Sequence, residues 1–76
     1  MDIRRIPIFN RGPGQLQIGL EPEGDWIQLE AGESLEIRYV REASDEPSIE
    51  LEVKGQLLSI HCMASKEVWR DGQRVR

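Results

Sequence analysis

The residues of this chain with the clearest chemical potential are the neighbours His61 and Cys62, its single histidine and single cysteine. An imidazole beside a thiol is the pair that a cysteine nucleophile needs. These two residues lie in a segment that alternates apolar and polar residues, and neighbours on a strand point to opposite faces of a sheet. We therefore expect Cys62 to be a small core residue and His61 a surface residue, with no catalytic role for either.

Carboxylates are the next candidates, because two of them can act as acid and base, and several with a histidine can bind a metal. Glu50 and Glu52 share one strand face, near His61. One imidazole without a ligand-spacing motif predicts no metal, and exposed carboxylates are poorly tuned for catalysis. The sequence contains no phosphate-binding loop, nucleophile elbow, zinc-protease motif or dinucleotide fingerprint. It predicts no catalytic residue, no metal and no cofactor, and so a protein that is not an enzyme.

The tryptophans and the C-terminal arginines are the candidates for binding, because Trp and Arg are the residue types that anchor protein interfaces. Trp26, Trp69, Arg70 and Arg74 are therefore our candidate interaction residues. The alternative is that the indoles pack within the domain, with Trp69 under Arg74 or in the core. If Trp69 is an interface residue, its change to Ala should weaken association more than it lowers the melting temperature.

These side chains must be positioned by strands, because the dominant period of apolar residues is two. The clearest alternation covers residues 16–21, 35–40, 49–54 and 58–63. Turn-forming residues recur at short intervals between these segments, and no window shows a sustained helical repeat. We predict an all-β fold, a single domain over residues 1–76. Its architecture is an antiparallel β-sandwich or a partly open barrel of about six to eight short strands.

Core matching and charge predict how the middle strands pair. Residues 33–41, 48–54 and 56–62 are expected to form one contiguous antiparallel meander. In the first pair of strands, Tyr39 lies opposite Leu51, because this register also sets opposite charges against each other on the wet face.

A two-residue turn at positions 55–56 would fix the second pair of strands. It places Ile49 opposite Cys62 on the buried face and Glu50 opposite His61 on the wet face. A slip of one residue would set apolar against polar side chains throughout.

Two further turns are predicted from their glycines. Asp71-Gly72 is a strong hairpin signal that places Trp69 opposite Arg74. A two-residue loop at positions 23–24 would set Ile18 opposite Leu29 and leave Trp26 outside, whereas a longer bulged loop could turn Trp26 inward.

Composition and charge limit the partners. The chain has 76 residues, 32 % of them charged, and a net charge of −4. Residues 21–52 contain eleven acidic and two basic side chains, a local net charge of −9. Nucleic-acid binders carry a concentrated basic surface, so nucleic acid is an unsuitable partner. No apolar run approaches the ~20 residues of a membrane span. A lone cysteine allows no intramolecular disulfide and fits the cytoplasm.

Two segments, NRGPGQLQIGLEPEG at 10–24 and LEAGESLEI at 29–37, resemble small uncharacterised bacterial all-β proteins and, more loosely, the first strands of immunoglobulin-like sandwiches. The ending VWRDG at 68–72 is similar to the same bacterial group. The Cys and Trp spacing of antibody domains is missing, because only Cys62 is present. The resemblance implies a fold and no activity, so it assigns no functional residues.

Two classes of function remain. The first is a non-enzymatic protein-interaction module of a small cytosolic bacterial protein, which binds a protein partner or associates with itself as a homodimer through a sheet edge or a Trp-bearing face. The alternative is a small ligand-binding protein or a minor enzyme subunit. That alternative needs a pocket, which a chain of this length can scarcely enclose.

Overall fold

The computed structural model describes residues 2–42, 46–52 and 56–76, and these form only strands and turns, with no helix. The strands are β1 (Ile3–Phe9), β2 (Leu16–Glu21), β3 (Asp25–Leu29), β4 (Ser34–Val40), β5 (Ser48–Glu52), β6 (Leu57–His61), β7 (Lys66–Arg70) and β8 (Gln73–Arg74). The predicted all-β fold is confirmed.

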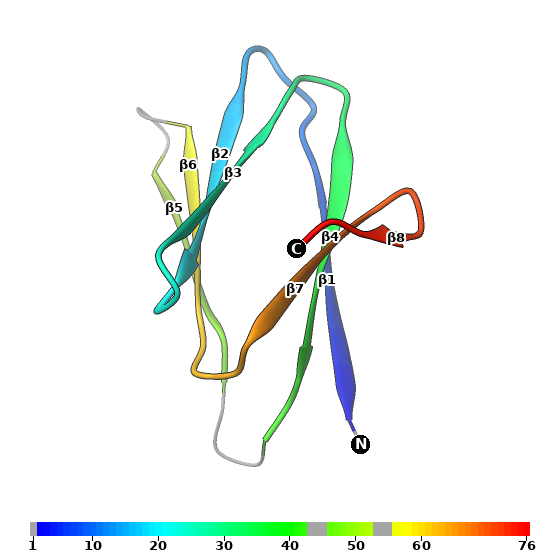
Figure 1. Ribbon diagram of the computed structural model, residues 1–76. Coiled ribbons are helices and arrows are strands. Elements are labelled where there is room, and N and C mark those ends of the chain that lie inside the picture. The colour runs from blue at the N-terminus through cyan, green and yellow to red at the C-terminus, as the bar shows by residue number, and fades with distance from the viewer. Residues whose placement is uncertain (1, 43–45, 53–55) are drawn as a thin grey trace.

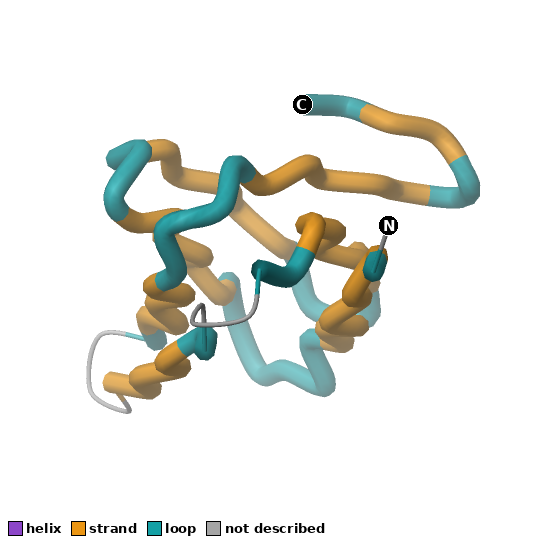
Figure 2. Tube along the Cα trace, turned by 90° about the horizontal axis from the view of Figure 1, so that it is seen from below, coloured by secondary structure: helices purple, strands orange, loops and turns teal. Residues whose placement is uncertain are grey.

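The strands form two four-stranded sheets in a sandwich, not a closed barrel (Figure 1). Sheet A has the strand order β1-β4-β7-β8, and sheet B has the order β3-β2-β6-β5. Neighbouring strands are antiparallel except β2 and β6, which run parallel. Strands β1 and β5 end the two sheets on one side of the sandwich, and β3 and β8 end them on the other side (Figure 2).

The core lies between the sheets and consists mainly of branched aliphatic side chains. The completely buried ones are Ile18, Leu20, Leu29, Ile37, Ile60 and Val68. Burying each side chain of this kind stabilises the fold by about 1.5–3 kcal/mol. They come from β2, β3, β4, β6 and β7, so the alternation along these strands correctly separates the inner face from the outer face.

The predicted three-strand meander is wrong. Strand β4 pairs with β1 and β7 in sheet A, whereas β5 pairs with β6 in sheet B. Tyr39 lies opposite Arg4 and Lys66, not opposite Leu51. Both edges of β4 are occupied, so the chain after it crosses to the other sheet. Matching charges across strands considers one pair of strands at a time. It therefore does not include the competition of β1 and β7 for the edges of β4.

The β5–β6 hairpin forms, but its register is shifted by two residues from the prediction. Ile49 lies opposite Ile60 rather than Cys62, so both remain on the same face. On the other face, Glu50 lies opposite Ser59, and the predicted Glu50–His61 pair is wrong. A shift of two preserves every face assignment, and alternation alone cannot exclude it. The predicted turn at 55–56 falls partly outside the described residues.

The β2–β3 hairpin shows the same kind of shift. Ile18 lies opposite Ile27 rather than Leu29, and the loop between the strands is longer than two residues. The amide of Gly24 donates to the Leu20 carbonyl at 2.8 Å, closing this turn. Trp26 nevertheless lies on the outer face, 51 % exposed, as predicted with the two-residue loop and not as predicted with the bulged loop.

The C-terminal hairpin matches its prediction. Trp69 lies opposite Arg74. Asp71 and Gly72 have φ values of 51° and 76°, the positive pair that a tight hairpin turn of this type requires. Beyond β8, the amides of Val75 and Arg76 both donate to one carbonyl, that of Val68, which is a bulge that ends the regular pairing.

Candidate interaction surface

Trp69 lies on the outer face of sheet A in a polar setting. The Arg38 guanidinium is stacked over its ring, 3.9 Å from the ring centre. Its indole N–H donates to the Glu67 carboxylate at 2.9 Å, and Glu67 also forms an ion pair with Arg74 at 3.3 Å. The cation over Trp69 is therefore Arg38 on the neighbouring strand, not Arg74 as expected. The indole is partly buried, and both its ring and its N–H have a partner within the fold.

Arg70 connects the two sheets. Its guanidinium donates to the carbonyl of Gln28 on β3 at 2.9 Å and lies 3.8 Å from the Glu33 carboxylate. Trp26 lies beside it on β3, and both line a shallow surface depression between β3 and β7. The four candidate residues therefore do not form one patch, because Trp69 and Arg74 face away from sheet B, and Trp26 faces away from sheet A.

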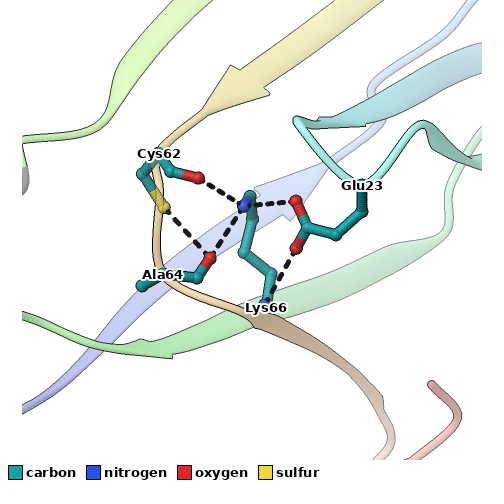
Figure 3. A network of polar contacts seen from close by, with 4 residues as sticks. All are labelled: Glu23, Cys62, Ala64 and Lys66. Atoms are coloured by element: carbon teal, nitrogen blue, oxygen red, sulfur yellow. Dashed lines mark hydrogen bonds and ion pairs between the residues drawn. The ribbon is translucent and has the colours of Figure 1, made fainter.

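A buried ion pair joins the β2–β3 turn to the β6–β7 connection (Figure 3). The Lys66 side chain is 0 % exposed, and its ammonium donates to Glu23 at 2.7 Å. It also donates to the carbonyls of Cys62 at 2.8 Å and Ala64 at 2.9 Å. Three acceptors therefore match the three protons of the ammonium, which makes its burial tolerable.

The pKa of the Glu23 carboxyl lies below its usual range. Partial burial alone would raise that pKa, but the hydrogen bonds from the Lys66 side chain and backbone, together with its charge, outweigh that effect. The Lys66 amide donates to the second carboxylate oxygen at 3.1 Å, so both oxygens are held. This arrangement favours the ionised form of the carboxylate.

Nothing in the sequence signals this pair, because 43 positions separate its members. Lysine and glutamate at such a distance look like two ordinary surface residues. Cys62 is buried, and its thiol donates to the Ala64 carbonyl at 3.8 Å. His61 is half-buried rather than the expected surface residue, and both residues line one surface depression. The predicted burial of Cys62 is therefore confirmed.

Sheet edges are the remaining candidates, since unpaired backbone groups there can accept another strand. We call the side formed by β3 and β7–β8 the braced side. There the Arg70 guanidinium donates a hydrogen bond to the Gln28 carbonyl of edge strand β3. The Arg76 guanidinium lies 3.7 Å from the Asp25 carboxylate. The other edge on this side, β8, has only two residues. Neither edge offers a long row of free groups.

The opposite side, formed by β1 and β5, we call the open side. In β1, the Asn10 amide donates to Glu33 and the Asp2 carbonyl accepts from Arg41, so even-numbered residues face β4. Odd-numbered residues therefore direct their backbone groups to the free edge. Pro7 is one of them, and it has no N–H to offer, which is the usual placement of an edge-strand proline.

Strand β5 has no such protection. Its pairing partner β6 uses its even-numbered residues for β2, as shown by the Cys62 amide that donates to the Glu21 carbonyl at 3.2 Å. The odd-numbered residues of β6 therefore face β5, and Ile49 and Leu51 on β5 direct their backbone groups to the free edge. No proline interrupts Ser48–Glu52.

The side chains of β5 are also largely exposed. Ile49 and Leu51 belong to the inner face of sheet B, yet they are 51 % and 62 % exposed, because sheet A does not extend over them. The outer-face carboxylates of Glu50 and Glu52 have no ion-pair partner among the described residues. By contrast, Glu36 on sheet A lies against two arginines. Alternation predicts an inner face, but it does not say whether that face is covered.

Residues suited to a metal do not gather in the described ranges: no three of the His, Cys, Asp and Glu side chains there come together as a ligand set. No helix that could cross a membrane occurs in the part of the chain that the structure describes. Comparisons of the chain with protein-family models, curated proteins and solved structures find no match.

Proposed function

We propose that this domain is a non-enzymatic interaction module that binds another polypeptide chain along β5 on the open side. The observation that carries this proposal is the combination of free backbone groups and exposed apolar side chains at Ile49 and Leu51. Main-chain hydrogen bonds provide affinity when a strand is added to a sheet edge, and pockets for alternate side chains provide specificity.

The other edges support this choice of strand. Pro7 removes an edge donor from β1, Arg70 occupies an edge acceptor of β3, and β8 is two residues long. Proteins that stay monomeric usually protect their sheet edges with such devices. An edge without them, carrying apolar side chains, is a natural place for a partner strand.

The test compares variants at two exposed apolar positions on opposite sides of the molecule, Leu51 at 62 % and Trp26 at 51 % exposure. Leu51→Lys places a charge on the inner face at the open side, and Trp26→Lys places one on the outer face of sheet B. Both should remain folded by circular dichroism. Capture of binding proteins from the native cell, together with light scattering against concentration, should show loss of association for Leu51→Lys only. Equal association of both variants with the parent protein would contradict the proposal.

Interaction through Trp26, Trp69, Arg70 and Arg74 stays a prediction, and the same assay tests it with Trp26→Lys and Trp69→Ala. The ligand-binding alternative also stays open to test, through the surface depression between Trp69 and Phe9 on the outer face of sheet A. A small molecule that bound there would shift the Trp69 fluorescence and leave the Leu51→Lys variant unaffected.

A further inference from the structure

We infer that the partner of β5 is β1 of a second copy of this chain, in a symmetric dimer that joins sheet A of each copy to sheet B of the other. This inference rests on the proposed function and names its occupant. A two-fold axis that relates the open sides brings β1 against the partner's β5 and β5 against the partner's β1 at once. The contact therefore closes on itself and builds no fibre.

Charge complementarity is the first argument for this occupant. The outer face of β5 carries Glu50 and Glu52, which have no cationic partner among the described residues. The outer face of β1 carries Arg5, whose side chain is 62 % exposed and reaches Glu36 only at 3.8 Å. A β5–β5 contact between two copies would bring acidic strands together, and like charges on facing strands are unfavourable.

Strand direction is the second argument. Strand β1 is antiparallel to β4, and β4 and β5 run in opposite directions, so β1 and β5 run the same way (Figure 1). A two-fold axis along the strands keeps these directions. It therefore pairs β1 with the partner's β5 in parallel, with the inner faces of both strands turned toward the same core.

The backbone parity of the two edges fits this parallel pairing. In a parallel pair, directly opposite residues share a face, but only one of them directs its backbone groups to the partner. In β1, the residues whose backbone groups point to the free edge are outer-face residues, such as Arg5. In β5, the residues whose backbone groups point to the free edge are the inner-face residues Ile49 and Leu51. An antiparallel pair would need the same face on both strands, so it would join an outer face to an inner one.

A register with Arg5 opposite Glu50 uses these groups well. The Arg5 amide donates to the Ile49 carbonyl, and the Leu51 amide donates to the Arg5 carbonyl. Pro7 then lies beyond this set, so its missing N–H shortens the ladder without breaking it. On the inner face, Ile6 packs beside Leu51, which extends the core across the open side.

The neighbouring Arg4 is an inner-face residue whose charge must stay hydrated. It forms an ion pair with Asp2 at 3.1 Å near the end of β1. In this register its aliphatic stem lies over Ile49, and its guanidinium reaches solvent beyond the last strand residues. The contact is therefore tolerable, and Arg4 limits how far the interface extends.

Charge reversal and restoration test this inference. Analytical ultracentrifugation of the parent chain should show a dimer, and Arg5→Glu and Glu50→Arg should each weaken dimerisation on the order of 10- to 100-fold. The variant that carries both changes should dimerise like the parent. An equimolar mixture of the two single variants should form a heterodimer, because every facing pair is then of opposite charge.

The control is Arg76→Glu, which reverses an exposed charge on the braced side and should leave dimerisation unchanged. A parent chain that remains monomeric at about 1 mM, or single variants that do not restore each other on mixing, would overturn the dimer. If the monomeric parent still binds another protein that Leu51→Lys fails to bind, the proposed function stands with a different occupant. If neither association is seen, both proposals fail.

Discussion

The braced side and the open side of this sandwich treat their charged residues in opposite ways. On the braced side, cationic side chains bind groups of the same fold. Arg70 donates to the Gln28 carbonyl at the edge of β3, and Lys66 forms an ion pair with Glu23 in the β2–β3 turn. On the open side, Glu50 and Glu52 point to solvent without a partner among the described residues, beside apolar side chains that sheet A leaves uncovered.

This contrast teaches that residue type alone does not identify a binding surface. Trp and Arg are typical of interfaces, and here Trp69 and Arg70 also make contacts within the domain. The aliphatic and acidic residues of β5 are less typical of interfaces, yet they are the ones with unused backbone and side-chain groups. Our proposal of the open side therefore rests on these groups and not on residue type.

The largest stability effect should come from the buried ion pair of the braced side. Glu23→Ala leaves the buried Lys66 ammonium with only its two carbonyl acceptors, and we expect a loss of about 2–3 kcal/mol in the free energy of unfolding. That is a large share of the roughly 4–11 kcal/mol expected for a domain of this size. Urea denaturation measures it, with Glu21→Ala as an unpaired acidic control that should cost less than about 0.5 kcal/mol. Equal costs for both would show that the pair contributes nothing.

The second effect concerns Trp69. Its change to Ala removes the stack with Arg38 and the bond to Glu67, and should cost about 1–2 kcal/mol of stability. Trp26→Ala, on the other sheet, is the matched control and should cost less, because that indole is half exposed and lies over Gly19 without a cation. Thermal unfolding compares them. If Trp69→Ala also abolished association while Leu51→Lys did not, the interface would lie on sheet A.

A smaller effect separates the two C-terminal arginines. Arg70→Ala removes a charged hydrogen bond to the Gln28 carbonyl and should lower the free energy of unfolding by about 1 kcal/mol. Arg74→Ala removes a more exposed ion pair with Glu67 and should change it by less than about 0.5 kcal/mol. Urea titrations of both variants, with the parent beside them, decide whether Arg70 braces the sandwich. The opposite ranking would show that it does not.

Acid should weaken the braced side gradually. The pKa of Glu23 is lowered in the folded state, so the stability that its ionised form adds is fully present above the unfolded pKa of 4.5. That stability is lost as the pH falls through the lower folded pKa. The urea midpoint of the parent should therefore fall more steeply in this acidic range than that of Glu23→Gln. Parallel curves would rule out a contribution from this carboxyl.

The smallest stability effect is expected on the open side, where the association effect is largest. Leu51→Ser removes an apolar side chain that is 62 % exposed and should change monomer stability by no more than about 0.5 kcal/mol. Measured below the dimer dissociation constant, its urea midpoint should match that of the parent. A loss above 1 kcal/mol would mean that β5 already packs against something within its own chain.

Local chemistry was readable from the sequence because it depends on neighbours along the chain. Alternation of period two predicted strands and their inner faces, and Asp71-Gly72 predicted the hairpin that places Trp69 opposite Arg74. The burial of Cys62 followed from the same alternation. None of these features needs a distant segment.

What only the tertiary structure decided depends on which segments compete for the same neighbour. The sequence favoured a β4–β5 pair, but β1 and β7 occupy both edges of β4. Registers in two hairpins slipped by two residues, because that shift conserves the faces that alternation specifies. The Lys66–Glu23 pair depends on the approach of two segments 43 positions apart, and the exposure of Leu51 depends on what covers β5 in the fold. No period along the chain encodes either feature.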